Sequence, residues 1–342
     1  MLTIGLATQT TGFLILSALS PDWSALVSVA WVVLAQGICG VAKDLTKTAS
    51  KSAIKIAETA AREEDSDGRL FRWVAWFTGS KNAMKGIGFF LGGLLLELIG
   101  FRGALWAMAA ALALILFGVI MSLPPMLGKA RASKSARELF GKNRGVNLLA
   151  AARVTLFGAR DVWFVVGVPV FLYAAGWSFT MVGSFVALWT IGYGAVQAAA
   201  PAFVKRSPDG LTEEIKAARL WSLILAAIPG AIAALLASNS GLRPDLILVV
   251  GLAIFGFAFA INSSARSYLI LAYAGSEKAA EDVGFYYAAN ALGRFAGTLL
   301  SGVLYQWGGV YACLIGSGVL LIACFLTTLA LPGRSSLAAM ES

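Results

Sequence analysis

Apolar residues in this chain come in long runs separated by short polar or glycine-rich breaks. Each run is about 20 residues long, the length that a helix needs to cross the hydrocarbon core of a bilayer. The runs lack the alternation of a membrane β-barrel, and backbone groups in lipid must be satisfied within their own segment, so we expect helices. The pattern predicts ten spans, at residues 2–19, 23–42, 73–99, 103–123, 151–174, 178–202, 218–237, 246–273, 282–307 and 310–331.

Composition supports a polytopic α-helical membrane protein. Hydrophobic residues make up 58% of the 342 residues and charged residues only 13%, whereas a soluble domain is about a quarter charged. The chain has no histidine, and Cys39, Cys313 and Cys324 lie in separate apolar runs without the spacing of a disulfide or zinc site. We therefore expect no metal, no cofactor and no enzymatic activity.

Basic residues gather in three loops on one side of the predicted spans. The loops at 43–72, 124–150 and 203–217 are rich in lysine and arginine, whereas the loops between them are short and nearly uncharged. Positive charge marks the cytoplasmic side, so the net charge of +9 predicts basic cytoplasmic loops and no nucleic-acid partner. We expect a multi-pass protein of the inner cell membrane with both termini in the cytoplasm.

An internal repeat predicts the architecture. The segment 82–117, with Gly100 inside it, recurs without gaps as 290–325, with Gly308 in the equivalent place 208 residues further on. The copies begin in the third and ninth spans, so the repeat unit is six helices, as in the two halves of major facilitator transporters. On this interpretation the first two of twelve helices are missing; the alternative is a protein of ten helices whose repeat is a coincidence. The predicted parts are an incomplete N-terminal half (1–123), a basic cytoplasmic linker (124–150), a six-helix C-terminal half (151–333) and a cytoplasmic tail (334–342).

Charged residues inside the third span are the first candidates for a binding site. A lysine at the bilayer centre costs roughly 2.5–3.5 kcal/mol on insertion scales and therefore usually faces a cavity. Lys85 lies about 18 Å into the span at 1.5 Å per residue, and Lys81 lies one turn shallower on the same face. Asn82 adds a hydrogen-bonding group. The alternative is that both lysines reach back to the membrane surface.

The fifth and ninth spans add three charged candidates and one amide. Arg160 is close to mid-membrane, with Asp161 next to it, and Arg294 follows Asn290 by one turn at a similar depth. Arg160 is a solute-binding candidate or a member of an internal ion pair, and Arg294 has gating or helix packing as its alternative. Asp161 is a candidate for proton coupling, because membrane carboxylates often serve it. We predict that Lys85, Arg160 and Arg294 line one cavity.

Four further basic residues lie nearer the expected cytoplasmic ends of their spans. Lys43 and Lys47 share a helix face with the same i, i+4 spacing that continues to Lys51 and Lys55. Such a stripe is often just solvated, but the first two lie where the helix meets the headgroups. Together with Arg153 and Arg266, we expect them to form an electropositive entrance for an anion.

Two blocks of sequence resemble a known family. They are Gly40-Val41-Ala42-Lys43-Asp44-Leu45-Thr46-Lys47 with the lysines that follow, and Thr78-Gly79-Ser80-Lys81-Asn82-Ala83-Met84-Lys85-Gly86 with Gly88, Gly92 and Gly93. These blocks resemble the organoarsenical efflux permeases of the ArsJ family, which belong to the major facilitators. The resemblance is dense over residues 37–105, and it begins at what would be the third helix of that family.

The resemblance implies a cargo. Members of that family export 1-arseno-3-phosphoglycerate, which a glyceraldehyde-3-phosphate dehydrogenase makes from arsenate, and so confer arsenate resistance. This partner is metabolic and implies no contact. Arginine and lysine suit such an oxyanion ester, and scattered cysteines do not suit trivalent arsenic. Two alternatives stay open: a carrier of another organic or phosphorylated anion, and a truncated, inactive transporter.

Overall fold

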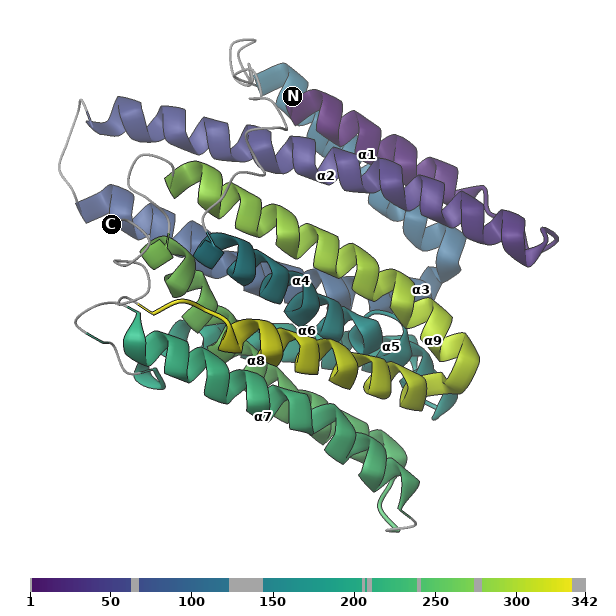
Figure 1. The fold of residues 1–342 in the computed structure, drawn as a ribbon. Helices are drawn as coiled ribbons and strands as arrows, with labels where there is room; N and C mark the ends of the chain where they lie inside the picture. Colours follow the sequence, from purple (N-terminus) through teal and green to yellow (C-terminus); the bar gives the residue numbers. More distant parts are fainter. Residues whose placement is uncertain are drawn as a thin grey trace. The chain divides into compact units, whose positions relative to one another are not determined.

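Helices make up most of the residues that the computed structural model describes, and no strand occurs among them (Figure 1). It describes residues 2–62, 68–122, 144–204, 207, 211–238, 241–273 and 279–333, and for residues 44, 47–62, 68–83, 201, 271 and 279–281 the backbone alone. The chain divides into two compact units, Met1–Ser133 and Lys134–Ser342, here called unit 1 and unit 2.

Unit 1 contains α1 (Leu2–Ser17), α2 (Ala25–Arg62) and α3 (Gly68–Ser122). The long helix α3 turns back on itself at Gly100, whose φ of 68° and ψ of 179° are far from helical values. Only glycine adopts this conformation at little cost, because it has no Cβ. The kink divides α3 into two arms, so unit 1 holds four helical segments where the sequence predicted four spans.

Unit 2 contains the remaining helices. They are α4 (Arg144–Phe164), α5 (Gly167–Ala174), α6 (Phe179–Ala199), the 3-10 turn η2 (Ala200–Ala202), α7 (Thr212–Ala237), α8 (Pro244–Tyr273) and α9 (Ala279–Leu329). The helix α9 is broken at Gly308 and Gly309, and the latter has a φ of 59°. The equivalent repeat positions Gly100 and Gly308 therefore both lie where a long apolar segment turns back.

The break between α4 and α5 interrupts one predicted span. The backbone N–H groups of Val166 and Gly167 both donate to Ser301 Oγ, at 3.2 and 3.3 Å. A side chain of α9 thus satisfies donors that the break would otherwise leave unpaired in an apolar environment. Counted as one, α4 and α5 bring unit 2 to six helical segments among the described residues.

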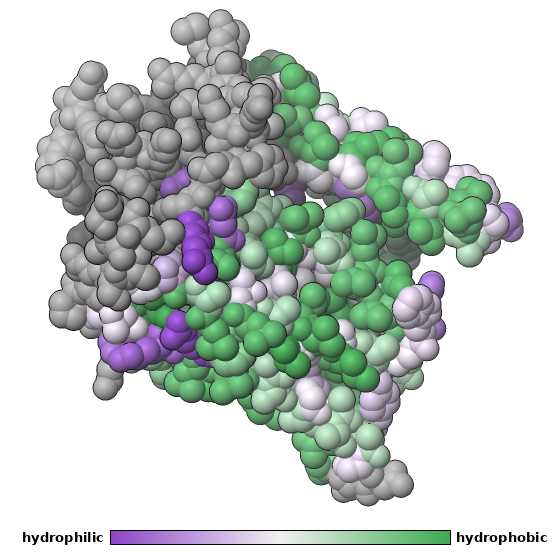
Figure 2. Space-filling view, viewed as in Figure 1, coloured by the Kyte–Doolittle hydropathy of each residue, from purple (hydrophilic) through white to green (hydrophobic). Residues whose placement is uncertain are grey.

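Among the described residues, seven helical stretches are long and apolar enough to span a membrane. The two longest, of 39 and 48 residues, contain the glycine kinks of α3 and α9. Large apolar side chains are exposed along these helices, for example Leu114, Leu188 and Ile315. Figure 2 shows hydrophobic residues over much of the described surface of unit 2 that faces the viewer. This surface fits lipid rather than water, so the chain is a multi-pass membrane protein.

The core of unit 2 is aromatic and aliphatic. Trp163 of α4 and Phe255 of α8 are both fully buried and meet edge to face, with ring centroids 5.1 Å apart. Phe157 and Phe259, one or two turns away on the same helices, meet in the same way at 5.1 Å. These pairs fix α4 against α8.

Candidate functional site

Three glycines bring α4 and the first arm of α9 into backbone contact. A Cβ on Gly297 would lie 2.5 Å from Gly158 O and 3.1 Å from Asp161 Cβ, and a Cβ on Gly293 would overlap the backbone of Val154. Small residues allow helices to approach this closely, and helix packing was the alternative that the sequence left open for Arg294. The contact places residues 158–161 of α4 opposite residues 293–297 of α9.

At this contact, two arginines share one carboxylate. Arg160 donates from Nε and Nη2 to Asp161 Oδ1, both at 2.6 Å, and Arg294 donates from Nε to Asp161 Oδ2 at 3.1 Å. Each carboxylate oxygen therefore binds a different arginine, one from its own helix and one from α9. Two guanidiniums face one carboxylate, so the cluster has a formal excess of one positive charge.

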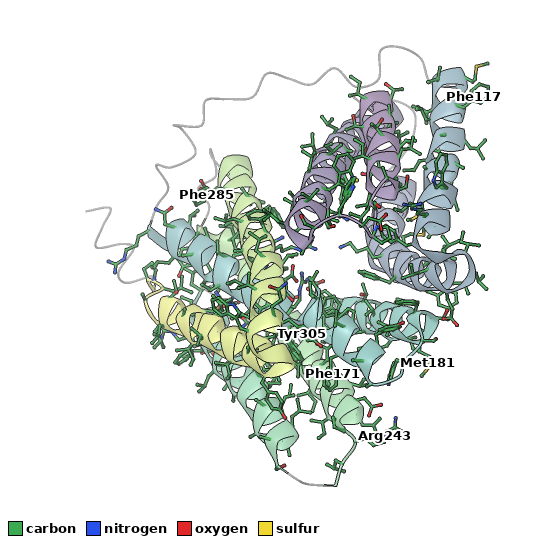
Figure 3. The ribbon with its side chains drawn as sticks, turned by 90° about the vertical axis from the view of Figure 1, so that its right-hand side faces the viewer. Phe117, Phe171, Met181, Arg243, Phe285 and Tyr305 are labelled. Carbon is green, nitrogen blue, oxygen red and sulfur yellow. The ribbon has the colours of Figure 1, made fainter. Side chains whose placement is uncertain are left out.

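Exposure differs sharply among the three members. The Asp161 side chain is only 1% exposed and that of Arg160 is 13% exposed, whereas that of Arg294 is 49% exposed. Arg294 is therefore anchored by Nε and presents the rest of its guanidinium at the surface of unit 2. Figure 3 shows the α9 arm from Phe285 to Tyr305, which carries this residue. An arginine in this position offers an oxyanion a planar, two-pronged donor.

Aromatic rings hold Arg160 from the other side. Its guanidinium carbon lies 4.9 Å from the centroid of Phe157 and 5.4 Å from that of Phe259. Contacts of this kind favour a cation over the ring face. One turn before Arg294, Asn290 is half-buried, and its Oδ1 has no hydrogen-bond partner among the residues that the structure describes. The cluster thus borders an unpaired acceptor as well as a cationic surface.

Arg153 lies two turns before Arg160 on α4 and is almost fully buried. Its Nη1 donates to Ser263 Oγ of α8 at 3.1 Å and to Tyr286 Oη of α9 at 2.9 Å, and its guanidinium carbon lies 4.0 Å from the centroid of Phe157. Arg153 and Arg160, which are seven residues apart on one face of α4, therefore both contact Phe157.

Arg266 of α8 is fully buried among neutral partners. Its Nε donates to Asn262 Oδ1 at 2.9 Å, and its Nη2 contacts three groups of α7 and α9. These are Ser222 Oγ at 2.8 Å, Thr328 Oγ1 at 2.5 Å and Cys324 Sγ at 3.2 Å. Within the described part of the chain, no carboxylate forms an ion pair with Arg266. Arg266 and its four partners are called the Arg266 cluster below.

The expected entrance therefore differs from what the structure contains. Arg153 is 5% exposed and Arg266 is 0% exposed, so neither offers its charge to a solute at an opening. The physical reason is that α4 begins at Arg144 and α8 continues to Tyr273, which places both residues well inside the packed helices. Both guanidinium groups instead form hydrogen bonds between helices of unit 2.

The candidates of unit 1 have fewer described contacts. Lys43 is exposed on α2 and Lys85 is exposed on α3. The side chains of Lys47, Lys81 and Asn82 lie outside the described residues. Because Lys85 belongs to unit 1 and Arg160 and Arg294 to unit 2, only the last two are brought together by described contacts. The convergence of all three stays a prediction.

Sequence reasoning missed the partners that come from other helices. Ser222, Thr328 and Cys324 bind Arg266 but lie 44 to 62 residues away in the chain. One signal was available: Asn262 and Arg266 are four residues apart and so share a helix face. No such signal pointed to Phe259 as a contact of Arg160, because Phe259 is on a different helix.

Comparison with known proteins shows a likeness in structure. No family model matches the chain, and no curated protein matches it. Among solved structures, it is similar to the crystal structure of the human organic anion transporter MFSD10 (TETRAN), with a TM-score of 0.54 and 19% sequence identity. The match covers 96% of this chain and 76% of the human one.

At this identity the likeness speaks for the fold alone. The chain is an all-α polytopic membrane protein with the major facilitator fold.

Proposed function

We propose that this protein is a secondary transporter of a small organic anion. The observation that carries the proposal is the cluster of Arg160, Asp161 and Arg294, in which a partly exposed arginine is held at mid-helix by a buried carboxylate. Ionisable groups within membrane spans are costly and usually belong to a solute or ion pathway. The similarity in fold to a protein described as an organic anion transporter supports the same class of solute.

The cluster offers a simple binding step. An anionic group of the cargo binds the exposed edge of Arg294, while Asp161 keeps the guanidinium oriented through Nε. Protonation of Asp161 weakens its hold on both arginines and strengthens their attraction for the anion. The carboxylate is therefore our candidate for proton coupling, and Asn290 Oδ1 is an acceptor for a hydroxyl group of the cargo.

Unit 1 contributes the remaining cations in this proposal. Lys85, together with Lys81 and Asn82, completes the binding site, and Lys43 and Lys47 attract the anion at the cytoplasmic opening. From the loop charges, we place both termini on the cytoplasmic side of the inner membrane. Residues 124–150 act as the basic linker between the halves 1–123 and 151–333.

The specific cargo that we propose is 1-arseno-3-phosphoglycerate. Support comes from the resemblance of residues 37–105 to the organoarsenical efflux permeases. A positively charged site without a thiol fits an ester that carries phosphate and arsenate groups. The metabolic partner would then be a glyceraldehyde-3-phosphate dehydrogenase, and the physiological result arsenate resistance.

The test uses inside-out membrane vesicles that contain the full chain. Radiolabelled arsenate is supplied with the dehydrogenase, glyceraldehyde 3-phosphate and NAD, or without the dehydrogenase. Dehydrogenase-dependent accumulation of arsenic supports the specific cargo. Accumulation of labelled phosphoglycerate or another organic anion without arsenic supports only the broader transporter. If neither accumulates above vesicles that lack the protein, the transport proposal is wrong.

A further inference from the structure

An apolar groove lies between α7 and α8, on a different part of unit 2 from the arginine cluster. Its volume is about 370 Å³, within the roughly 300–1,000 Å³ of typical small-molecule sites. Aliphatic side chains line almost all of it, including Leu235, Leu246, Val250 and Ile254, each about half exposed. In a bilayer this groove opens to the acyl chains.

The groove owes its shape to small residues. Ala231 lines it on α7 and Gly251 on α8. A Cβ on Gly251 would lie 2.5 Å from Ile232 Cδ1, so the glycine lets the two helices approach at this level. Nearer their shared loop, the side chains of Leu242 and Leu246 form the walls instead. The result is an elongated space bounded by two helices, which suits a flexible chain better than a compact ligand.

One end of the groove carries the marks of a membrane interface. Arg243 lines this end, immediately before α8 begins, and its side chain is 72% exposed (Figure 3). Its Nε and Nη2 donate to Asp245, at 3.2 and 2.8 Å, and Trp177 Nε1 donates to the same carboxylate at 3.0 Å. Tryptophan and arginine concentrate where the hydrocarbon core meets the headgroups. The rest of the groove then extends inward from headgroup depth.

We infer that this groove binds one acyl chain of an anionic phospholipid, with the headgroup phosphate on Arg243. Charge complementarity selects the headgroup. Asp245 holds the guanidinium by one edge, and Nη1 makes no hydrogen bond to any residue that the structure describes. That nitrogen and the remaining Nη2 proton can bind a phosphate oxygen pair. The lipid would pack against α7 and α8 and bridge them from the membrane side.

The experiment compares lipid retention by purified full-length protein. The protein is placed in nanodiscs that contain equal amounts of phosphatidylglycerol and phosphatidylcholine, and native mass spectrometry counts the lipids released with it. We expect one tightly retained phosphatidylglycerol. Ala231→Phe fills the groove and should abolish retention of either lipid. Arg243→Gln should lower the preference for phosphatidylglycerol about tenfold, the effect of losing one charge-assisted hydrogen bond.

Two matched controls separate the site from general lipid contact. Arg243→Lys keeps the charge and should keep the preference. Leu223→Phe adds an aromatic ring at an exposed position of α7, the helix of Ala231, but outside the groove. It should change neither the retention of lipid nor the preference for phosphatidylglycerol. Equal retention of both lipids by the unaltered protein would overturn the inference, and so would unchanged retention in Ala231→Phe. Neither result depends on whether the protein transports anions.

Discussion

Unit 2 contains two sites built around arginine, and the environment of the guanidinium differs between them. In the Arg266 cluster, the guanidinium is fully buried and its described partners are a serine, an asparagine, a threonine and a cysteine. In the Arg160–Asp161–Arg294 cluster, a carboxylate is buried instead, and one of its two arginines is half exposed. The first site is closed and the second is open on one side.

The difference indicates which arginine is able to meet a solute. Neutral partners from three helices enclose Arg266 and tie α7, α8 and α9 together, so its role is to fix the packing. Asp161 compensates the charge of Arg294 but binds only its Nε, and the Arg294 side chain stays half exposed. The predicted depths differed, with Arg266 nearer the cytoplasmic end of its span and Arg294 near mid-membrane. They did not predict which arginine is enclosed, because the direction of each side chain around its helix decides that.

The largest expected effect is on stability, from Arg266→Ala. The substitution leaves the Ser222 hydroxyl, the Asn262 amide and the Thr328 hydroxyl buried with fewer partners, and an unsatisfied buried polar group costs about 1–3 kcal/mol. We expect the free energy of unfolding in detergent to fall by about 3–5 kcal/mol in total, which also includes lost packing. Chemical unfolding followed by tryptophan fluorescence measures it. Unchanged stability with lost transport would instead place Arg266 in the solute pathway.

Arg294→Gln should have the opposite profile. Because the side chain is half exposed, its loss should leave the unfolding midpoint close to that of the unaltered protein. Transport should fall about 10- to 100-fold, since a hydrogen bond between charged groups contributes about 1.5–3 kcal/mol. Vesicle uptake measures the second effect. Lys216→Gln, an exposed basic residue on α7, is the control and should transport normally; normal transport by Arg294→Gln as well would remove this residue from the site.

Gly297→Ala tests whether close helix packing positions the open cluster. Its new Cβ would lie 2.5 Å from Gly158 O, so α4 and α9 must separate, and overpacking of this kind costs about 1–3 kcal/mol. We expect lower stability together with weaker transport, because Asp161 no longer reaches both arginines. Gly302→Ala on the same helix has open space and should be neutral or slightly stabilising. Equal behaviour of the two variants would show that the spacing is not critical.

The sequence predicted the helical segments well but not how deeply each charge is enclosed. Apolar runs and the repeat located the turns at Gly100 and Gly308, because a long apolar segment must turn where the chain allows a positive φ or a break. The starts of the helices were predicted less accurately. The predicted span began at residue 151, whereas α4 begins at Arg144, because a helix can extend beyond the apolar run that identifies the span.

The site was predictable only in part. Arg160, Asp161 and Arg294 stood out because charge is rare in such spans, and the alternative of an internal ion pair for Arg160 is present in the structure. The connection of Arg294 to Asp161 spans 133 residues and depends on how α4 packs against α9. No local pattern encodes that contact, which occurs where Gly293 and Gly297 let the two helices approach.

The smallest expected change in anion binding is that of Asp161→Asn, and this variant separates binding from coupling. The amide keeps the shape of the side chain and an oxygen that accepts from one arginine, but it removes the negative charge that competes with the cargo. Equilibrium binding of the anion should therefore tighten a few-fold, as expected when a like-charged neighbour worth about 1 kcal/mol is removed. Accumulation driven by a proton gradient should be lost, while exchange of labelled for unlabelled anion across the membrane continues. Binding to purified protein and the two vesicle assays measure these quantities separately. If Asp161→Asn still accumulates the anion against its gradient, Asp161 does not couple transport to protons, and its role is confined to holding Arg160 and Arg294 in place.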